Sequence, residues 1–305
     1  MRKVYCVGET VFDIIFKNSK PIEAKPGGSM LNTAVSLGRI KVPVNLISEY
    51  SKDSVGKLID LFLKNNSVNI DHVYKFDNGK TPLALGFLNE ENNANYSFYK
   101  NYPEKRLAIN FPEIKKDDII LFGSLYAISK EIWNIINDFL KKAKQKKAII
   151  IYDPNYRISN LLDIKKIKPY ILKSISLADI IRGSDEDFNH IFNTTNSEKT
   201  FDFIQKNNCS NLIYTANKNG VSLHTKNYSK KYKVPTIKPV STIAAGDSFN
   251  AGLIYSILKN KISLEKINSI KPEMWNEVIK TSIDFATDVC LSYENYISKE
   301  FVFKT

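Results

Sequence analysis

Short apolar runs alternate with amphipathic segments along most of the 305-residue chain. Such short, continuous runs are typical of buried strands. They lie at 4–7, 44–49, 119–122, 148–152, 180–181 and 212–215. Apolar residues at helical spacing predict helices, among them 57–65, 130–145, 249–258 and 279–293. Strands that alternate with helices predict an α/β fold, with a doubly wound, mostly parallel sheet sandwiched by helices.

Two segments depart from this alternation and predict a second, smaller sheet. Residues 80–101 alternate apolar and polar positions on either side of the polar turn 90–93, which is a hairpin signal. Residues 14–26 look extended, with a turn in the middle. We expect these insertions to form a small β-sheet lid over one end of the main sheet, within a single domain that covers 1–305. On the lid, Phe98 could pack against its neighbours or stack on a substrate.

Composition narrows the class of protein. With 43% hydrophobic residues the chain can bury a sizeable core, and its net charge is +12. The excess charge comes from lysines that are spread along the chain, whereas nucleic-acid readers concentrate basic residues in one patch with arginine forks. We therefore expect no nucleic-acid partner, although a positive field would help to collect an anionic nucleotide.

The three cysteines show neither a metal-ligand spacing nor an even disulfide framework, so reduced thiols are expected. The three histidines are scattered, which argues against a histidine metal site. No apolar run approaches the roughly 18 residues of a membrane span, and the first residues do not form a signal peptide. We expect a cytoplasmic protein that does not contact a membrane.

The most informative stretch is 239–252, in which small residues lead into a helix. The first N–H groups of a helix have no intrahelical partners, and the helix dipole favours an anion beside them. The residues before Gly246, together with Gly252, favour close approach of a ligand to the backbone. Asp247 stands in this site, where it could simply cap the helix. We favour a base beside N–H groups that stabilise a developing negative charge, the pairing needed for phosphoryl transfer to an alcohol.

A second stretch, 26–40, carries the double glycine Gly27-Gly28 at the start of an amphipathic helix. A double glycine admits a ligand against the backbone, and Asn32 could hold a hydroxyl through both its donor and its acceptor. The alternative is a flexible loop before a helix. The spacing does not fit a GxGxxG dinucleotide fingerprint. Asp13, which follows the first strand, is either a hydroxyl acceptor or an ordinary loop acid.

Polar clusters follow three of the predicted strands, where α/β proteins hold ligands. An acid, an amide and a fork-shaped cation occur together in 153–157. The acids of 185–187 could organise a hydrated magnesium ion or cap a helix. Thr215 and Gly220 suit the phosphates or ribose of a nucleotide.

Taken together, these stretches resemble the ribokinase-like (PfkB-type) carbohydrate kinases over nearly the full chain, and they are most similar to fructokinases. The motif Thr242…Ala245-Gly246-Asp247 is specific to the family. The other motifs are weak singly but strong evidence in this order along the chain, and they are Gly8-Glu9…Asp13, Gly27-Gly28…Asn32…Arg39, 153–157, Ser184…Asp187 and Thr215…Gly220. The fructokinase likeness rests on the Gly-Glu opening, 80–84, 97–99, 153–157 and 183–186.

The resemblance implies ATP, Mg²⁺ and transfer of the γ-phosphate to a sugar hydroxyl, commonly a primary one. It makes Asp247 the base and the N–H groups of Ala245, Gly246 and Asp247 the anion hole. It implies that the sugar meets Asp13, Gly27, Gly28, Asn32, Phe98, Asn155 and Arg157. It implies that ATP meets Ser184, Thr215, Asn217, Gly220, Ala244, Gly246 and Asn250, with Asp187 reaching the metal through water. Family lids often pair between subunits, which implies a homodimer.

Several alternatives stay open. A 2-keto-3-deoxygluconate kinase would use Arg157 against a carboxylate, and other sugar or nucleoside kinases share the same motifs. Ser241 replaces the family's usual Asp near a monovalent-cation site, which leaves potassium activation open. Asn217 stands where glycine is usual. A sugar- or nucleotide-binding sensor without turnover is the rival from another class, and the absence of GxGxxG and of a P-loop argues against nicotinamide oxidoreductases and P-loop kinases.

Overall fold

A ten-stranded sheet runs through the centre of the structure, a computed structural model that describes residues 2–90, 94–156 and 164–301. The strand order is β14-β13-β12-β11-β10-β9-β1-β4-β5, and β6 pairs with β4. The strands are β1 (Val4–Val7), β4 (Val44–Ser51), β5 (Val68–Asn69), β6 (Val73–Phe76), β9 (Ile119–Gly123), β10 (Ile149–Asp153), β11 (Ile180–Ser184), β12 (Asn211–Thr215), β13 (Val221–Thr225) and β14 (Ser229–Tyr232). Only the β12–β13 and β13–β14 pairings are antiparallel among these described strands.

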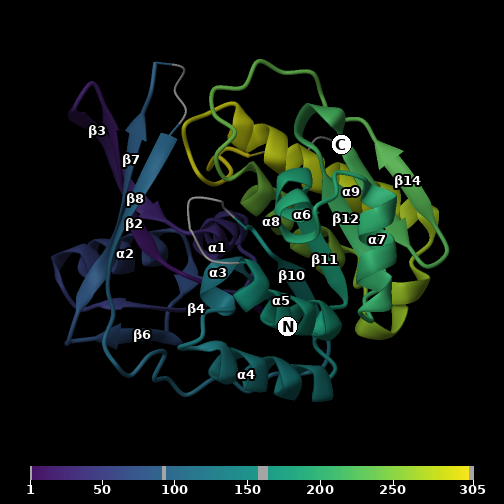
Figure 1. Ribbon diagram of the computed structural model, residues 1–305, viewed down its shortest axis with the longest axis horizontal. Helices are drawn as coiled ribbons and strands as arrows, with labels where there is room; N and C mark the ends of the chain where they lie inside the picture. The colour runs from purple at the N-terminus through teal and green to yellow at the C-terminus, as the bar shows by residue number, and fades with distance from the viewer. Residues whose placement is uncertain (1, 91–93, 157–163, 302–305) are drawn as a thin grey trace.

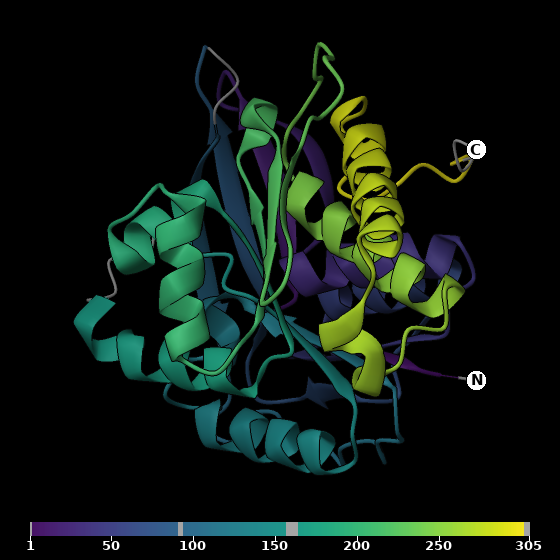
Figure 2. The same cartoon turned by 90° about the vertical axis from the view of Figure 1, so that its right-hand side faces the viewer.

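Helices cover both faces of this sheet (Figures 1 and 2). One face packs against α1 (Ser29–Arg39), α2 (Ser54–Asn65), α8 (Ala245–Lys259) and α9 (Pro272–Cys290). The other packs against α3 (Ser124–Ala127), α4 (Trp133–Gln145), α5 (Ile164–Leu177), α6 (Asp185–Phe192) and α7 (Ser197–Lys206). Side chains alternate across a strand, so Cys6 belongs to the first core and Val7 to the second. The predicted α/β sandwich with a doubly wound, mostly parallel sheet is confirmed.

A second sheet of four strands stands beside the main one, on the left of Figure 1. Its order is β3-β2-β7-β8, with β2 (Val11–Lys17), β3 (Lys20–Gly27), β7 (Lys80–Leu88) and β8 (Ala94–Asn101). The β2–β3 and β7–β8 pairs are antiparallel, and β2 runs parallel to β7. The predicted small sheet is therefore present, and it begins at Val11, earlier than expected. Its action as a lid stays a prediction.

Several element boundaries were predicted wrongly. Helix α8 begins at Ala245 rather than at residue 249, so the small residues form its first turn. Helix α9 begins at Pro272 rather than at residue 279 and ends at Cys290, and proline is well suited to the first helical position. Strand β11 continues through Arg182 to Ser184 instead of ending at Ile181. The continuation was not predicted because Arg182 interrupts the apolar run by which a buried strand is recognised.

No helix among residues 2–90, 94–156 and 164–301 combines the length and apolarity needed to cross a membrane.

Candidate active site

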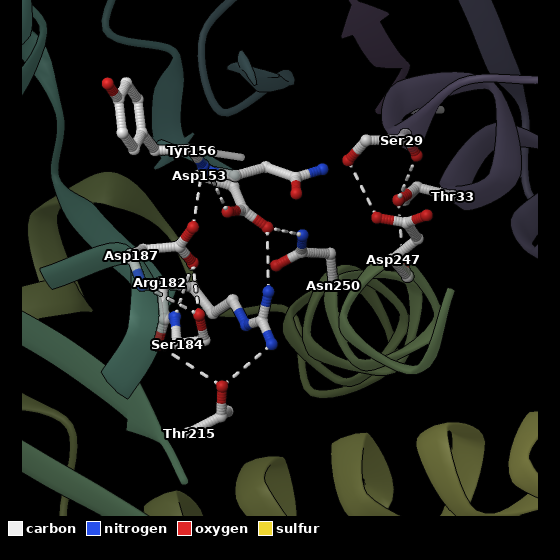
Figure 3. A network of polar contacts seen from close by, with 12 residues as sticks. Ser29, Thr33, Asp153, Tyr156, Arg182, Ser184, Asp187, Thr215, Asp247 and Asn250 are labelled. Atoms are coloured by element: carbon white, nitrogen blue, oxygen red, sulfur yellow. Dashed lines mark hydrogen bonds and ion pairs between the residues drawn. The ribbon is translucent and has the colours of Figure 1, made fainter. Parts of the chain in front are cut away.

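Helices α1 and α8 pack together and bring Asp247 to Asn32. Asn32 Nδ2 donates to Asp247 Oδ2 at 2.8 Å, and Ser29 Oγ donates to Oδ1 at 2.7 Å. Thr33 Oγ1 donates to the backbone carbonyl of Asp247 at 2.8 Å, so two α1 hydroxyl groups flank the acid (Figure 3). The Asp247 residue is only 8% exposed. Two side chains of α1 therefore hold this carboxylate, and a third holds the backbone of the same residue.

The first turn of α8 supplies backbone donors beside the same carboxylate. Its N-cap is Ala244, which lies in the left-handed region with φ 59°. The residues that follow, Ala245, Gly246 and Asp247, form the first turn of a 15-residue helix. N–H groups of a first helical turn point out of the helix end, where the helix dipole is positive. This end of α8 is therefore suited to an anion.

Two consecutive glycines lead into α1, and each lies close against another part of the chain. Gly28 has φ +123°, and a Cβ there would run into the carbonyl oxygen of Glu9. A Cβ at Gly27 would run into the carboxylate of Asp13, so that acid lies directly against the Gly27 backbone. Burial raises the pKa of Asp13 to about 7, with Lys25 acting in the opposite direction and Glu23 adding to the rise. Asp13 is thus a partly buried acid on strand β2 of the small sheet, next to the backbone that leads into α1.

A second polar network lies beneath α8 and joins it to the carboxyl ends of three strands (Figure 3). Arg182 of β11 donates from Nη1 to Asp153 Oδ2 at 3.0 Å and from Nη2 to Thr215 Oγ1 at 2.8 Å. Asn250 Nδ2 of α8 donates to the same Asp153 oxygen at 2.6 Å. Burial raises the pKa of Asp153, while the Arg182 charge lowers it. The network is a buried ion pair shared with an amide and a hydroxyl group.

The acids at 185–187 open helix α6. Ser184 and Asp187 form a capping box, in which Asp187 Oδ2 accepts from the Ser184 N–H and hydroxyl groups at 2.7 Å each. Asp187 Oδ1 accepts from the Tyr156 N–H at 2.6 Å. Of the two roles expected for this acid run, the structure shows the helix cap. Contact of Asp187 with a metal through water stays a prediction.

The family model described as "pfkB family carbohydrate kinase" matches residues 1–271. The chain belongs to the pfkB family of carbohydrate kinases. It is 29% identical over 277 residues to "Probable fructokinase-6, chloroplastic" of Arabidopsis thaliana, a match that covers 86% of this chain and 71% of the relative. The resemblance to this family seen in the sequence is confirmed.

Solved structures share the fold of this pfkB family chain. Aminoimidazole riboside kinase from Salmonella enterica, complexed with aminoimidazole riboside and an ATP analog, superposes with a TM-score of 0.83 at 16% identity, over 98% of this chain and 97% of the other. A fructokinase double mutant from Vibrio cholerae O395, bound to fructose, ADP and potassium ion, also gives 0.83, at 18% identity and over 97% and 94% of the two chains. At these identities the likeness establishes the fold alone.

Of the other predicted residues, Asn155 contacts the second network, whereas Gly220 and Ser241 form local hydrogen bonds. The Asn155 N–H donates to Asp153 Oδ1 at 3.0 Å, so Asn155 joins the buried ion pair through its backbone. Gly220 has φ +98° at the end of a 3₁₀ turn, Asn217–Asn219, and its carbonyl accepts from Ala216. Ser241 Oγ accepts from the Ile243 N–H at 3.2 Å. Arg157 lies outside the described residues.

Phe98 belongs to the small sheet and is not part of either network. Its ring stacks on Tyr96 with centroids 6.1 Å apart, and Lys100 Nζ lies 5.1 Å from its centroid. The residue is 39% exposed. The packing alternative is therefore present in the structure, and contact with a substrate stays a prediction.

No role was expected from the sequence for Ser29, Thr33 or Arg182, and Asp153 was noted only as the acid of the polar cluster 153–157. Ser29 stands three positions before Asn32 and four before Thr33 on the same helix, and this spacing was the available signal. For Arg182 the signal was a charge within an apolar strand, because a buried charge requires a partner.

Proposed function

We propose that this pfkB family kinase transfers the γ-phosphate of ATP to a hydroxyl group of a small sugar, a primary hydroxyl of fructose in the first instance. The observation that carries the proposal is the Asp247 carboxylate, held by Ser29 and Asn32 at the positive end of α8. A base and an anion site at one helix end are the two groups that phosphoryl transfer to an alcohol requires.

The same contacts support a role for Asn32 towards the sugar. Its Nδ2 is used on Asp247, and its Oδ1 is buried without a hydrogen-bond partner among the described residues. A buried acceptor of this kind carries an energetic cost that an incoming hydroxyl donor would relieve. A carboxylate has about four acceptor positions, so Asp247 can take a sugar hydroxyl while it keeps its contacts to α1.

In the proposed reaction, Asp247 accepts the proton of the sugar hydroxyl as that oxygen attacks the γ-phosphorus in line. The N–H groups of Ala245, Gly246 and Asp247 stabilise the charge on the transferred group. Asp13 and the backbone at Gly27 and Gly28 hold other sugar hydroxyls. Closure of the small sheet would exclude the water that could otherwise be phosphorylated in place of sugar.

Magnesium fits this site as an ion that arrives with ATP. Among the residues that the structure describes, no three His, Cys, Asp or Glu side chains form a group that could hold a metal. Both Asp187 oxygens are engaged in hydrogen bonds, so its contact with a hydrated ion would pass through water. When bound, the ion supplies charge neutralisation of the phosphates.

Fructose is favoured by the names of the relatives, such as the probable fructokinase of Arabidopsis thaliana. A riboside acceptor is the second candidate, because the aminoimidazole riboside kinase superposes equally well. We also retain a cytoplasmic location and a homodimer through the small sheet, whose exposed apolar side chains include Ile22, Phe87 and Tyr99.

One screen tests the proposal. ADP formation from ATP is measured with fructose, tagatose, ribose, 2-keto-3-deoxygluconate and nucleosides, with and without potassium. Fructose-dependent ADP formation is expected, with little ADP formed when no acceptor is present. Binding of sugar or nucleotide without any ADP formation would identify a sensor instead. Rapid ATP hydrolysis in the absence of sugar would contradict the proposed exclusion of water.

A further inference from the structure

Arg182 lies directly beneath the first turn of α8. A Cβ built on Gly246 would stand 2.5 Å from Arg182 Nη1 and 2.8 Å from Nη2, so the guanidinium group packs against the Gly246 backbone. Gly246 is the middle residue of the proposed anion hole. A permanent positive charge therefore lies in van der Waals contact with the peptide unit that would face the transferred phosphoryl group.

The guanidinium group is fixed in this place from three directions. Its two terminal nitrogens donate to Asp153 Oδ2 and Thr215 Oγ1, on the strands on either side of β11. The ring of Phe249 lies 5.7 Å from the guanidinium carbon. Arg182 is 7% exposed, so water screens its charge poorly. A fixed, poorly screened charge acts on a developing anion without any reorganisation during the reaction.

The countercharge of Arg182 is spread over several other donors. The Asp153 carboxylate accepts from Asn250 Nδ2 and from the Asn155 N–H as well as from Arg182. Arg182 Nε is buried without a hydrogen-bond partner among the residues described. The carboxylate is thus shared among three donors, and Asp153 is the one acid that forms an ion pair with Arg182 within the described part of the chain. Outside helix α8 itself, the three heavy atoms nearest to a Cβ on Gly246 all belong to the guanidinium group, so the positive member of the ion pair faces the helix end, where the helix dipole is also positive.

We infer that Arg182 is a positioning residue of the anion hole, whose charge beneath Gly246 raises the affinity of the α8 N-terminus for a phosphoryl group in transfer. The inference rests on the proposed function for the identity of that anion. The alternative is a structural ion pair that only ties β10, β11 and α8 together. The two differ in what happens when each member of the pair is neutralised separately.

The test compares Arg182→Met, Arg182→Lys and Asp153→Asn with the wild type. Titration calorimetry measures the affinity for ADP with aluminium fluoride, a mimic of the group in transfer, and for ADP alone, both with the acceptor sugar. Arg182→Met should bind the mimic about tenfold more weakly, with a similar loss in kcat, while its affinity for ADP alone and its KM for sugar stay within about twofold. Arg182→Lys should recover most of the loss because it keeps the charge.

Asp153→Asn separates the two explanations, since it removes the countercharge and leaves Arg182 in place. It should bind the mimic at least as tightly as the wild type. If the ion pair were only structural, Arg182→Met and Asp153→Asn would both bind the mimic more weakly than the wild type. If Arg182→Lys bound the mimic as weakly as Arg182→Met, the role of charge would be refuted.

Arg182→Met leaves a buried carboxylate without its cation, and that can prevent folding. The double variant Arg182→Met/Asp153→Asn removes both charges and carries the test in that case. Wild-type affinity of the folded double variant for the mimic overturns the inference. Failure of the wild type to form ADP with any sugar overturns the proposed function, whereas a loss of mimic affinity on removal of Arg182 would still support the charge beneath Gly246.

Discussion

The side-chain amide of Asn32 donates to Asp247 Oδ2 at 2.8 Å, although 215 positions separate the two residues in the chain. The contact joins the first turns of α1 and α8, which lie on the same face of the main sheet. Asn32 was expected to hold the sugar, and Asp247 was expected to take its proton. Both expected roles now fall within one hydrogen-bonded cluster, so substitutions in that cluster can separate binding from turnover.

Replacement of Asp247 by Asn should abolish the base and preserve the shape of the site. Removal of a general base costs about 10²- to 10⁴-fold in rate, so kcat of Asp247→Asn should fall at least ~100-fold. Kd for ATP should change little, and KM for the sugar should change less than kcat, because the new amide oxygen can still accept from Ser29 while its NH2 group requires the Asn32 amide to flip. Steady-state kinetics and ATP titration provide the measurement.

The matched control for that substitution is Asp138→Asn on α4. Asp138 has a side chain that is 68% exposed and forms only a 3.7 Å ion pair with Lys141 one turn away. Pairs of this kind contribute little, so its kcat should equal that of the wild type. Turnover near the wild-type rate in Asp247→Asn would show that another group acts as the base.

Ser29 and Thr33 allow the orientation of the Asp247 carboxylate to be tested apart from its chemistry. Ser29→Ala removes the 2.7 Å hydrogen bond to Oδ1 and should lower kcat about tenfold, since hydrogen bonds to charged groups are worth about 1.5–3 kcal/mol. Thr33→Val removes a hydroxyl group that contacts only backbone carbonyls, those of Asp247 and Ser29, and should lower the free energy of unfolding by about 1 kcal/mol. Equal losses of kcat in the two variants would contradict a specific role for Ser29.

Asp13 gives sugar binding a pH dependence. Burial raises its pKa to about 7, and only the ionised carboxylate is a strong acceptor for a sugar hydroxyl. The value of kcat/KM for sugar should therefore rise with pH up to about 7 and then level off. At pH 6 it should be about one-tenth of its plateau value, and Asp13→Asn should give a lower, flatter profile. A wild-type slope retained in Asp13→Asn would assign the titration to another group.

Stability should respond to the same group with a defined sign. The pKa of Asp13 rises on folding from 3.8 to about 7, so the folded protein binds this proton more tightly than the unfolded chain. The stability that Asp13 contributes is fully present below about pH 4 and is lost as the pH rises through about 7. Urea unfolding should show Asp13→Asn gaining stability relative to the wild type between pH 4 and pH 7. A difference that stays constant over this range would contradict the shift.

The main sheet could be predicted because both of its faces are covered. Strands such as Ile149–Asp153 are buried on both sides and appear in the sequence as continuous apolar runs. The small sheet was visible as alternation at 80–101, because it has a covered and an exposed face. Helix starts were harder to predict, since the first turn of α8 contains Gly246, Asp247 and Ser248, whose preference for helix is weaker than that of alanine.

The site was only partly accessible from the sequence, for a physical reason. Gly28, Asn32 and Asp247 could be proposed from local chemistry, namely a double glycine and a helix opening. The partners of Arg182 could not, because Asp153 and Thr215 come from the strands on either side and depend on strand order. Ser29 required knowledge that α1 and α8 pack with their first turns together. A single position can show that a buried charge needs a partner, but it does not show which distant residue supplies it.

The two glycines before α1 should respond differently to the same substitution. Gly28→Ala places a Cβ against the Glu9 carbonyl at φ +123°, and neither the backbone nor the dihedral angle can relax cheaply. Gly28→Ala should lower the free energy of unfolding by about 2 kcal/mol or more, as measured by urea unfolding.

In Gly27→Ala the new methyl group meets the Asp13 carboxylate, which is the end of a side chain that can rotate away. Gly27→Ala should therefore stay folded and raise KM for sugar by tenfold or more, through displacement of Asp13, with kcat changed far less. A loss of stability in Gly27→Ala as large as that in Gly28→Ala, or an unchanged KM for sugar, would contradict this prediction. Either result would show that Gly27 does not serve to leave room for a sugar-binding Asp13.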